Sequence, residues 1–147
     1  MSLPYETATS GKRAIDDMQK ILQEFGCRSL GHMMNFERGE LLVQFEYRDR
    51  QVSVKASAKG YAAAWLQRNP YKPRMRTSRV DYEKKALQLG ATAVYSIIRD
   101  WLKGQIMAVE TGVLSFDGAF LGQLMLPTGM TVLDRMYAPG GLLEPPK

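Results

Sequence analysis

Apolar residues near the start of the chain recur every three to four positions, which is the spacing of one helix face. The recurring positions are Ala14, Ile15, Met18, Ile21, Leu22 and Phe25. Gly26 follows directly, and glycine readily adopts the left-handed conformation that ends many helices. The pattern therefore predicts a helix over residues 11–25, with one face buried.

Three segments of alternating apolar and smaller or polar residues follow, and this alternation is typical of β-strands. Their apolar-face positions are Leu30, His32, Met34 and Phe36, then Leu41, Val43, Phe45 and Tyr47, then Val52, Val54 and Ala56. Short turns at residues 37–39 and 49–50 separate them, and short connections join antiparallel strands. We expect a three-stranded antiparallel meander with one apolar face and one mixed face.

Two further helices are predicted in the middle of the chain. Ser57 is a good N-cap for a short helix, which must end near Asn69 because a proline follows. Ser78 can cap the next helix, and no proline interrupts residues 80–111. At 1.5 Å per residue this helix would be about 45 Å long. Its middle is apolar on most faces, which suits either a central core helix or a dimer seam.

Glycines inside this long helix carry structural information because glycine lowers helix propensity. Gly90 and Gly104 are therefore expected to mark places where another backbone packs closely. After the long helix, a short amphipathic segment begins at Ser115, and a last helical turn or two is predicted over residues 131–136.

The order of elements is thus one helix, three strands and then a run of helices, which favours an α+β fold with helices packed on one sheet face. We expect residues 1–9 to form an N-terminal arm and residues 10–137 to form a single α+β domain. Residues 138–147 begin with a proline-glycine turn and are expected to form a loosely ordered tail.

Composition places the chain among ordinary globular proteins. Its 147 residues are 45% hydrophobic and 24% charged. The single cysteine, Cys27, rules out an internal disulfide framework. The longest apolar runs fall far short of the roughly 20 residues that a membrane span requires, and no segment resembles a secretory signal. We therefore expect a cytoplasmic protein.

Charge is unevenly distributed along the chain, and its distribution bears on the kind of partner that we expect. Residues 68–79, named the basic loop, contain five basic residues and no acidic residue, although the whole chain has a net charge of only +5. The wider window 48–103 holds 13 basic and 4 acidic residues, a charge of +9. Such asymmetry indicates an anionic partner for the middle of the chain.

Most catalytic chemistry finds no support in the sequence. Cys27 and His32 are too few for a zinc site, and we expect no metal and no cofactor. Phosphate-binding glycine motifs and the nucleophile elbow are absent. A metal-dependent nuclease could use Glu40, Glu46 and Lys55, but Ser53 stands where the common nuclease core has an acid. Nuclease activity is therefore the least favoured function.

The basic loop offers the strongest positive signal, because arginines and lysines interleaved with an aromatic residue suit phosphate contacts and base stacking. Its candidate nucleic-acid-binding residues are Arg68, Tyr71, Lys72, Arg74, Arg76 and Arg79. Nearby basic residues that could extend this surface are Arg48, Arg50, Lys55 and Lys59. A solvated loop would explain the same charge run, but the complete absence of acids favours binding.

Three stretches resemble small conserved proteins of alphaproteobacterial genomes and prophages: SGKRAI, VKASAKGYAAAWL and RDWLKGQIMAVETGVLSFDGAFLGQLMLPTG. The resemblance spans residues 5–135 and assigns no role to any residue. Its link to phages suits DNA transactions and equally suits an inhibitor of a host protein. More loosely, the three strands and following helix at residues 28–68 are similar in topology to phage single-strand annealing proteins, and topology alone does not fix function.

Two functions therefore stay open beside nuclease activity. The first is non-enzymatic, largely sequence-tolerant nucleic-acid binding. The second is a protein-interaction module, a homodimer or an inhibitor of a host protein, that uses the long helix. Its candidate interface residues are Leu89, Val94, Ile97, Ile98 and Trp101. Salt distinguishes the two, because phosphate contacts weaken steeply with ionic strength and apolar contacts do not.

Overall fold

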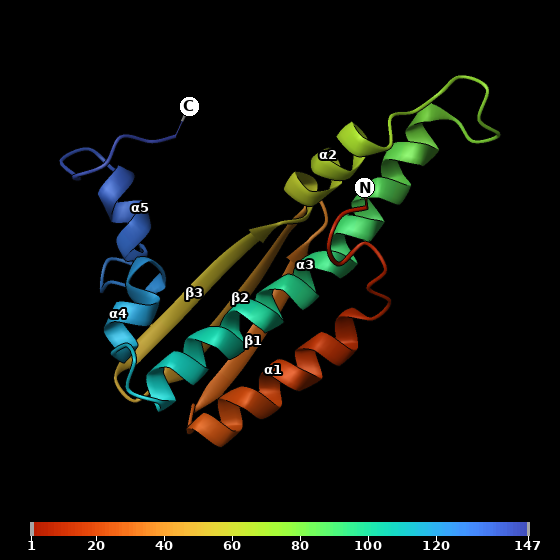
Figure 1. Ribbon diagram of the computed structural model, residues 1–147. Helices are drawn as coiled ribbons and strands as arrows, with labels where there is room; N and C mark the ends of the chain where they lie inside the picture. Colours follow the sequence, from red (N-terminus) through yellow and green to blue (C-terminus); the bar gives the residue numbers. More distant parts are fainter. Residues whose placement is uncertain (1, 147) are drawn as a thin grey trace.

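A computed structural model describes residues 2–146 and shows a three-stranded antiparallel sheet with two helices across one face (Figure 1). The α+β prediction is confirmed. The elements are α1 (Gly11–Phe25), β1 (Ser29–Asn35), β2 (Glu40–Tyr47), β3 (Arg50–Ser57), α2 (Ala58–Arg68), α3 (Arg79–Glu110), α4 (Phe116–Phe120), the short 3-10 helix η1 (Leu121–Gln123) and α5 (Val132–Tyr137).

Local sequence signals fix the helix ends where they were predicted. The side chain of Ser10 accepts a hydrogen bond from Arg13 N, and Gly26 ends α1 with a φ of 100°. Ser57 and Ser78 cap α2 and α3 in the same way, each accepting from a backbone N–H three residues later. These caps satisfy N–H groups that the first helical turn leaves without partners.

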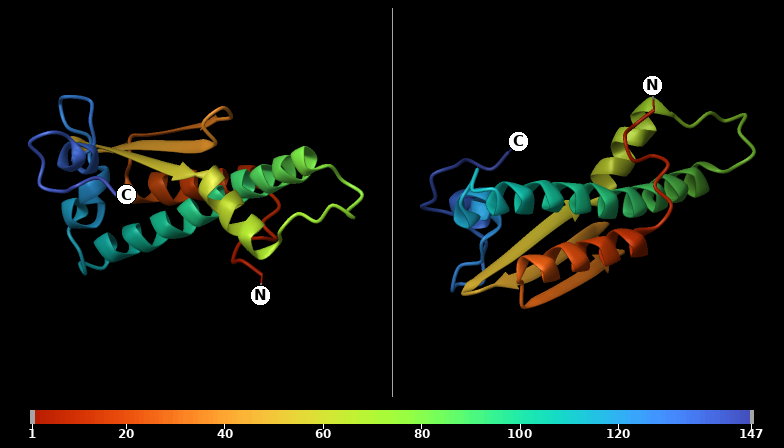
Figure 2. Two further views of the ribbon diagram at one scale, coloured as in Figure 1. Left: turned by 90° about the horizontal axis from the view of Figure 1, so that it is seen from above. Right: turned by 60° about the horizontal axis from the view of Figure 1, so that its bottom comes forward.

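The sheet has the order β1-β2-β3 and a register in which Phe45 lies opposite Leu30 and Val52. Buried and half-buried residues alternate along β2, so Leu41, Val43 and Phe45 face inward. Helices α1 and α3 lie side by side over this inward face (Figure 2). The opposite face carries Leu42, Gln44 and Glu46 of β2.

The long helix α3 is a central core helix, as one of the two alternatives for its sequence predicted. Ala86, Ala93, Leu102 and Ile106 along it are all buried. The main core joins side chains from α1, the sheet, α3 and α4. Its fully buried members include Met18, Leu22, Phe45, Val52, Leu102 and Phe120.

The two glycines of α3 behave differently. A Cβ at Gly90 would lie 2.4 Å from the carbonyl oxygen of Ala58, so α2 packs directly on α3 at this point. At Gly104 a Cβ would meet no atom within 4 Å. The prediction of close packing is confirmed for Gly90 and wrong for Gly104, because no element covers α3 there.

Segments outside the central layers are held by specific contacts. In the N-terminal arm, Tyr5 Oη donates to Asp100 at 2.6 Å, and Trp65 Nε1 donates to Glu6 at 3.0 Å. At the other end of the chain, Met125 N donates to the carbonyl oxygen of Gln51 at 2.8 Å, which attaches the C-terminal segment to the edge of β3. Among residues 2–146, no helix combines the length and the apolar character needed to cross a bilayer.

Candidate nucleic-acid interface

The basic loop joins α2 to α3 and lies at the far end of this helical hairpin, away from the sheet (Figure 1). Its backbone is held by one tyrosine hydroxyl from within the loop and by another from α3. Tyr71 Oη donates to the carbonyl oxygen of Thr77 at 2.9 Å, and Tyr82 Oη donates to that of Asn69 at 2.7 Å. The Tyr82 ring packs between those of Trp65 and Tyr71, with centroid distances of 5.4 and 5.6 Å. A small aromatic cluster therefore braces the loop at its base.

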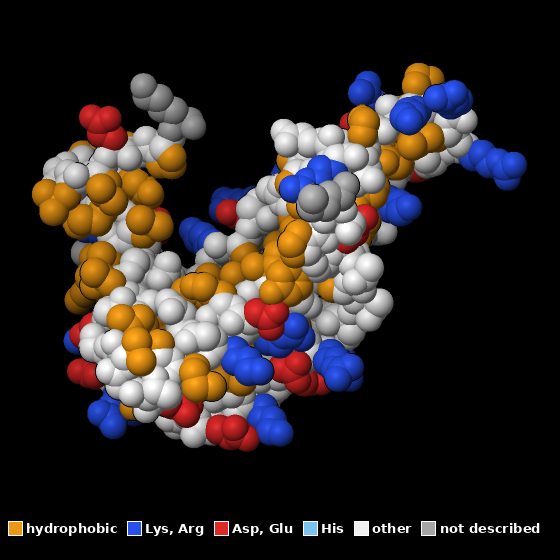
Figure 3. All heavy atoms as spheres, viewed as in Figure 1, with side chains coloured by type: hydrophobic (Ala, Val, Ile, Leu, Met, Phe, Trp, Pro, Cys, Tyr) orange, Lys and Arg blue, Asp and Glu red, His pale blue; other side chains and the backbone are white. Residues whose placement is uncertain are grey.

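Three cations project freely from this braced loop. Lys72, Arg74 and Arg76 are exposed and form no hydrogen bond or ion pair through their side chains with any residue in 2–146. Lysine and arginine side chains gather visibly at this end of the molecule (Figure 3). Unpaired cations on a constrained loop can bind phosphates without first breaking an internal contact.

The two ends of the loop are partly engaged. Arg79 Nε lies 3.7 Å from Glu83 Oε1, but both side chains are exposed, so this pair is weak. The Arg79 guanidinium also lies 5.9 Å from the centroid of the Tyr71 ring. Arg68 Nη1 donates to the carbonyl oxygen of Ser2 at 3.5 Å. Phosphate contacts by these two arginines would compete with existing interactions.

Tyr71 was predicted as a stacking residue, and the structure gives it a structural role. It is half-buried, its hydroxyl bonds Thr77, and its ring already contacts Tyr82 and Arg79. These contacts explain why the loop keeps its shape. Base stacking on Tyr71 would have to compete with them.

The predicted extension of this surface by Arg48 and Arg50 is not brought together with the loop. Both lie at the β2–β3 turn, and β3 runs its full length from there before α2 begins (Figure 1). Arg50 Nε and Nη2 donate to the two carboxylate oxygens of Asp117 at 2.8 and 2.9 Å. This hydrogen bonding holds the pKa of Asp117 below its usual value and raises the pKa of Arg50. The Arg48 guanidinium lies 5.1 Å from the Tyr47 ring centroid.

Lys59 and Lys55 are also separate from the loop. Lys59 Nζ donates to the carbonyl oxygen of Glu37 at 3.1 Å, at the start of α2. Along α2, Lys59 and Asn69 are roughly 15 Å apart at a rise of 1.5 Å per residue. Lys55 is exposed on β3 and lies opposite Leu42.

Sequence reasoning missed Lys84 and Lys85 as members of the same surface. Both are exposed near the start of α3, beside the loop, with no side-chain partner among the described residues. Residues 68–85 hold seven basic and two acidic residues, a charge of +5. Continuing the charge count past Arg79 into the helix would have found them.

Groups considered for catalysis do not converge. Glu40 and Glu46 lie on the same strand and face, roughly 20 Å apart at 3.3 Å per residue, which is too far to share one metal ion. The part of the chain that the structure describes brings no three His, Cys, Asp or Glu side chains together for a metal. The His32 ring meets the edge of Tyr95, and burial raises the pKa of the Cys27 thiol to about 11.

Of the apolar residues predicted for a dimer seam, only Val94 is buried, and the others are half-buried. Val94 is 5% exposed, and Ile98 and Trp101 pack against the main core. Leu89 packs with the aromatic cluster at the hairpin, and Ile97 is half-buried.

Comparison with known proteins returned no matching family model, curated protein or solved structure.

Proposed function

We propose that this protein binds nucleic acid without enzymatic activity, through the end of the α2–α3 hairpin. The observation that supports this most is the set of three exposed cations, Lys72, Arg74 and Arg76, that lack internal partners. Phosphate contacts by such side chains release condensed counterions, which supplies most of the affinity of sequence-independent binding. The proposed setting is cytoplasmic, where the resemblance to prophage proteins suits DNA transactions.

Binding would tolerate different sequences. The loop presents flexible cations that suit the backbone, and the Tyr71 ring, the aromatic group nearest to them, is engaged by Tyr82 and Arg79. Contacts to phosphates position a protein on nucleic acid but read no sequence. Arg68, Arg79, Lys84 and Lys85 would add contacts along the sides of the same hairpin end.

The direct test measures fluorescence anisotropy of labelled single- and double-stranded oligonucleotides over a range of salt concentrations. The loop variant carries Lys72→Glu, Arg74→Glu and Arg76→Glu. A matched variant carries Arg28→Glu, Arg38→Glu and Lys55→Glu, which changes the net charge equally at exposed positions away from the loop. Circular dichroism checks that both variants are folded.

We expect wild-type affinity to fall steeply with salt and the loop variant to lose most of it. Each phosphate contact to a single strand contributes a slope of about −0.7 to the plot of log affinity against log salt, so removing three contacts should make it shallower by about 2. The matched variant should keep most of the slope. Equal losses in the two variants would reject the loop as a site, and no binding at low salt would reject the function.

A second proposal is a protein-interaction module, and it rests on a different surface from the predicted one. Because the apolar side of α3 is used in the core, the surface we propose for a partner is the segment 113–143, which exposes more large apolar side chains than any other described part of the chain. They include Leu121, Leu133, Leu142 and Leu143, and apolar side chains gather around α4 and α5 in Figure 3. Binding through them would be nearly insensitive to salt, whereas binding through the basic loop would not.

A further inference from the structure

A polar pocket lies between α1 and α3, away from the basic loop. Its walls come from the N-terminal arm, the first turns of α1 and the middle of α3. The lining polar side chains include Thr7, Thr9, Ser10, Arg13, Ser96 and Arg99. Hydroxyl groups and guanidinium groups, which can all donate hydrogen bonds, therefore dominate this pocket.

Ser96 points to a ligand because the residue is 6% exposed while its hydroxyl, which lines the pocket, has no hydrogen-bond partner among residues 2–146. Only two polar residues are buried in the part of the chain that the structure describes, Ser53 at 7% exposure and Ser96 at 6%. The Ser53 hydroxyl accepts a hydrogen bond from Gln44 Nε2 at 3.3 Å, whereas the Ser96 side chain makes none with residues 2–146. No fully enclosed side-chain polar atom among these residues lacks a partner, so the Ser96 hydroxyl must keep access to the pocket that it lines.

The N-terminus of α1 opens onto the same pocket. Ser10 satisfies the N–H of Arg13, while the N–H groups of Gly11 and Lys12 have no carbonyl within the helix to bond. The first turn contains Lys12 and Arg13 and no acidic residue. Cations are unfavourable at this end of a helix, because the helix dipole is positive there, so helix stability does not explain these two residues. An anion bound in the pocket would explain Arg13, which lines it.

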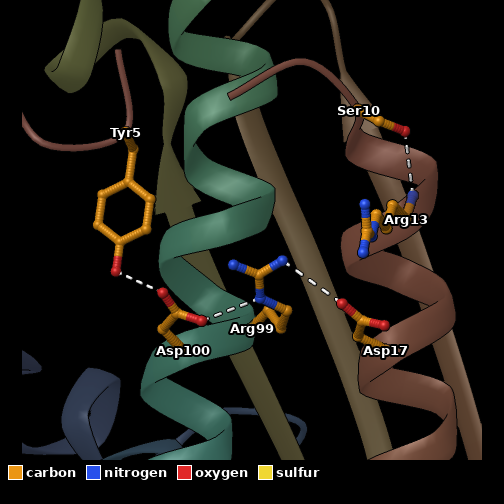
Figure 4. A network of polar contacts seen from close by, with 6 residues as sticks. All are labelled: Tyr5, Ser10, Arg13, Asp17, Arg99 and Asp100. Atoms are coloured by element: carbon orange, nitrogen blue, oxygen red, sulfur yellow. Dashed lines mark hydrogen bonds and ion pairs between the residues drawn. The ribbon is translucent and has the colours of Figure 1, made fainter. Parts of the chain in front are cut away.

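Close packing holds these groups in place. A Cβ at Gly11 would lie 2.8 Å from Cδ2 of Tyr95, so glycine allows the start of α1 to lie directly on α3. Arg99 Nη1 bonds Asp17 at 3.4 Å, and Arg99 Nε bonds Asp100 at 2.9 Å. Figure 4 shows Arg99 from α3 and Arg13 from α1 extending into the space between the two helices.

The charge of the pocket favours an anion even though it contains a carboxylate. Asp17 lines it, but this carboxylate is already paired with Arg99. The Arg13 side chain has no hydrogen bond or ion pair with the described residues and is exposed at the rim. One unpaired guanidinium, free backbone N–H groups and hydroxyl donors together match a tetrahedral oxyanion.

We propose that this pocket is a phosphate-binding site formed by Arg13 and Ser96 beside the N-terminal cap of α1. The inference does not rest on the function of the basic loop. The phosphate has two sources with the same chemistry: a backbone phosphate of a nucleic acid that also contacts the loop, or a free phosphate compound. Along α3, Arg79 and Ser96 are roughly 26 Å apart at 1.5 Å per residue. A duplex that reaches both sites must therefore contain about eight base pairs at 3.4 Å each.

The first experiment titrates full-length protein with inorganic phosphate at constant ionic strength and follows backbone amides by nuclear magnetic resonance. We expect saturable shifts at Gly11, Lys12 and Ser96. Arg13→Gln and Ser96→Ala should each weaken phosphate binding about fivefold or more, within the range of one lost charge-assisted hydrogen bond. Arg28→Gln, a matched loss of charge outside the pocket, should leave binding unchanged. Shifts that do not saturate, or that Ser96→Ala does not alter, would overturn the proposal.

The second experiment identifies the source of the phosphate with duplexes of 6 and 20 base pairs. If the pocket holds a backbone phosphate, Arg13→Gln weakens binding of the longer duplex and leaves binding of the shorter one unchanged. If it holds a free phosphate compound, Arg13→Gln affects inorganic phosphate alone. The Lys72→Glu, Arg74→Glu, Arg76→Glu variant should still bind inorganic phosphate, so a failure of the basic loop and a failure of the pocket give different results.

Discussion

Two ends of the molecule carry arginines, and only the hairpin end leaves two of them, Arg74 and Arg76, without a partner among the described residues. At the hairpin end, Lys72, Arg74 and Arg76 project from a braced loop without partners among the described residues. At the β2–β3 turn, Arg50 forms a two-point ion pair with Asp117, and Arg48 lies over Tyr47. The sequence shows positive charge at both ends. The difference shows that pairing in the fold, rather than charge count, decides which cations remain available to a ligand.

The two ends also differ in how they are stabilised. The β2–β3 turn lies beside the main core, where Phe120 meets the rings of Phe45 and Trp101 at 5.5 and 5.7 Å. The hairpin end depends on the smaller cluster of Trp65 and Tyr82. Substitutions at the two ends should therefore have different consequences for global stability and for the loop.

The largest effect is expected from Phe120→Ala. Phe120 is 0% exposed in the main core, and removal of such a side chain costs about 3–5 kcal/mol. Chemical denaturation should show this loss of unfolding free energy. Because Phe120 also follows Asp117 in the chain, the Arg50 ion pair should loosen as well. A loss below about 1 kcal/mol would contradict the assignment of Phe120 to the main core.

The next effect separates the two glycines of α3. Gly90→Ala should destabilise the protein by about 1–3 kcal/mol, because the new methyl group would clash with the Ala58 carbonyl and push α2 away. Gly104→Ala is the matched control and should stabilise by up to about 1 kcal/mol through helix propensity. Thermal unfolding of both variants gives the comparison. Equal shifts of the same sign would contradict the close contact at Gly90.

A smaller effect is expected from Tyr71→Phe, which removes the hydroxyl that bonds Thr77 and keeps the ring. The net loss of one such hydrogen bond is about 1 kcal/mol. Hydrogen exchange should show faster opening of the basic loop, with little change in the sheet. If Tyr71 braces the loop, the Tyr71→Phe variant should bind oligonucleotides slightly more weakly than the wild type. If the Tyr71→Phe and Tyr71→Ala variants bind oligonucleotides with equal affinity, the ring has no role in either bracing or stacking.

The smallest effect concerns the exposed pair at the β2–β3 turn and depends on pH. Arg50 lowers the pKa of Asp117 from its ordinary value of 3.8, so the pair stabilises the fold above pH 3.8. This contribution is lost as the pH falls through the lowered pKa. Asp117→Asn should therefore be slightly less stable than wild type at neutral pH, and the difference should vanish in strong acid. A difference that grows on acidification would contradict the pairing.

Much of the fold could be predicted because its signals are local. Ser10 and Gly26 define α1, and the alternation along β2 defines the sheet face. The pairing of Arg50 with Asp117 could not be predicted, since 67 residues separate them and only the fold brings them together. The same holds for Gly104, because only the packing around the second half of α3 shows that nothing lies within 4 Å of a Cβ at this position. The local charge of the sequence located the basic loop. Only the structure shows which of its cations have internal contacts and which do not.

The pocket beside α1 could not be predicted from the sequence either. The sequence shows Lys12 and Arg13 at the start of a helix, but Ser96 joins them only through the packing of α1 on α3. That Ser96 is buried while its hydroxyl stays open to a pocket is visible only in three dimensions. The signal available beforehand was the absence of any acid from the first turn of α1.

The central claim is that nucleic acid binds at the hairpin end rather than at the β2–β3 turn. Its most direct test is an amide chemical-shift titration of the wild-type protein with a 20-nucleotide single strand at low salt. The largest shifts should fall within residues 71–79, and residues 47–50 should stay unchanged. Largest shifts at residues 47–50 or along the open sheet face, with the basic loop unaffected, would contradict the account.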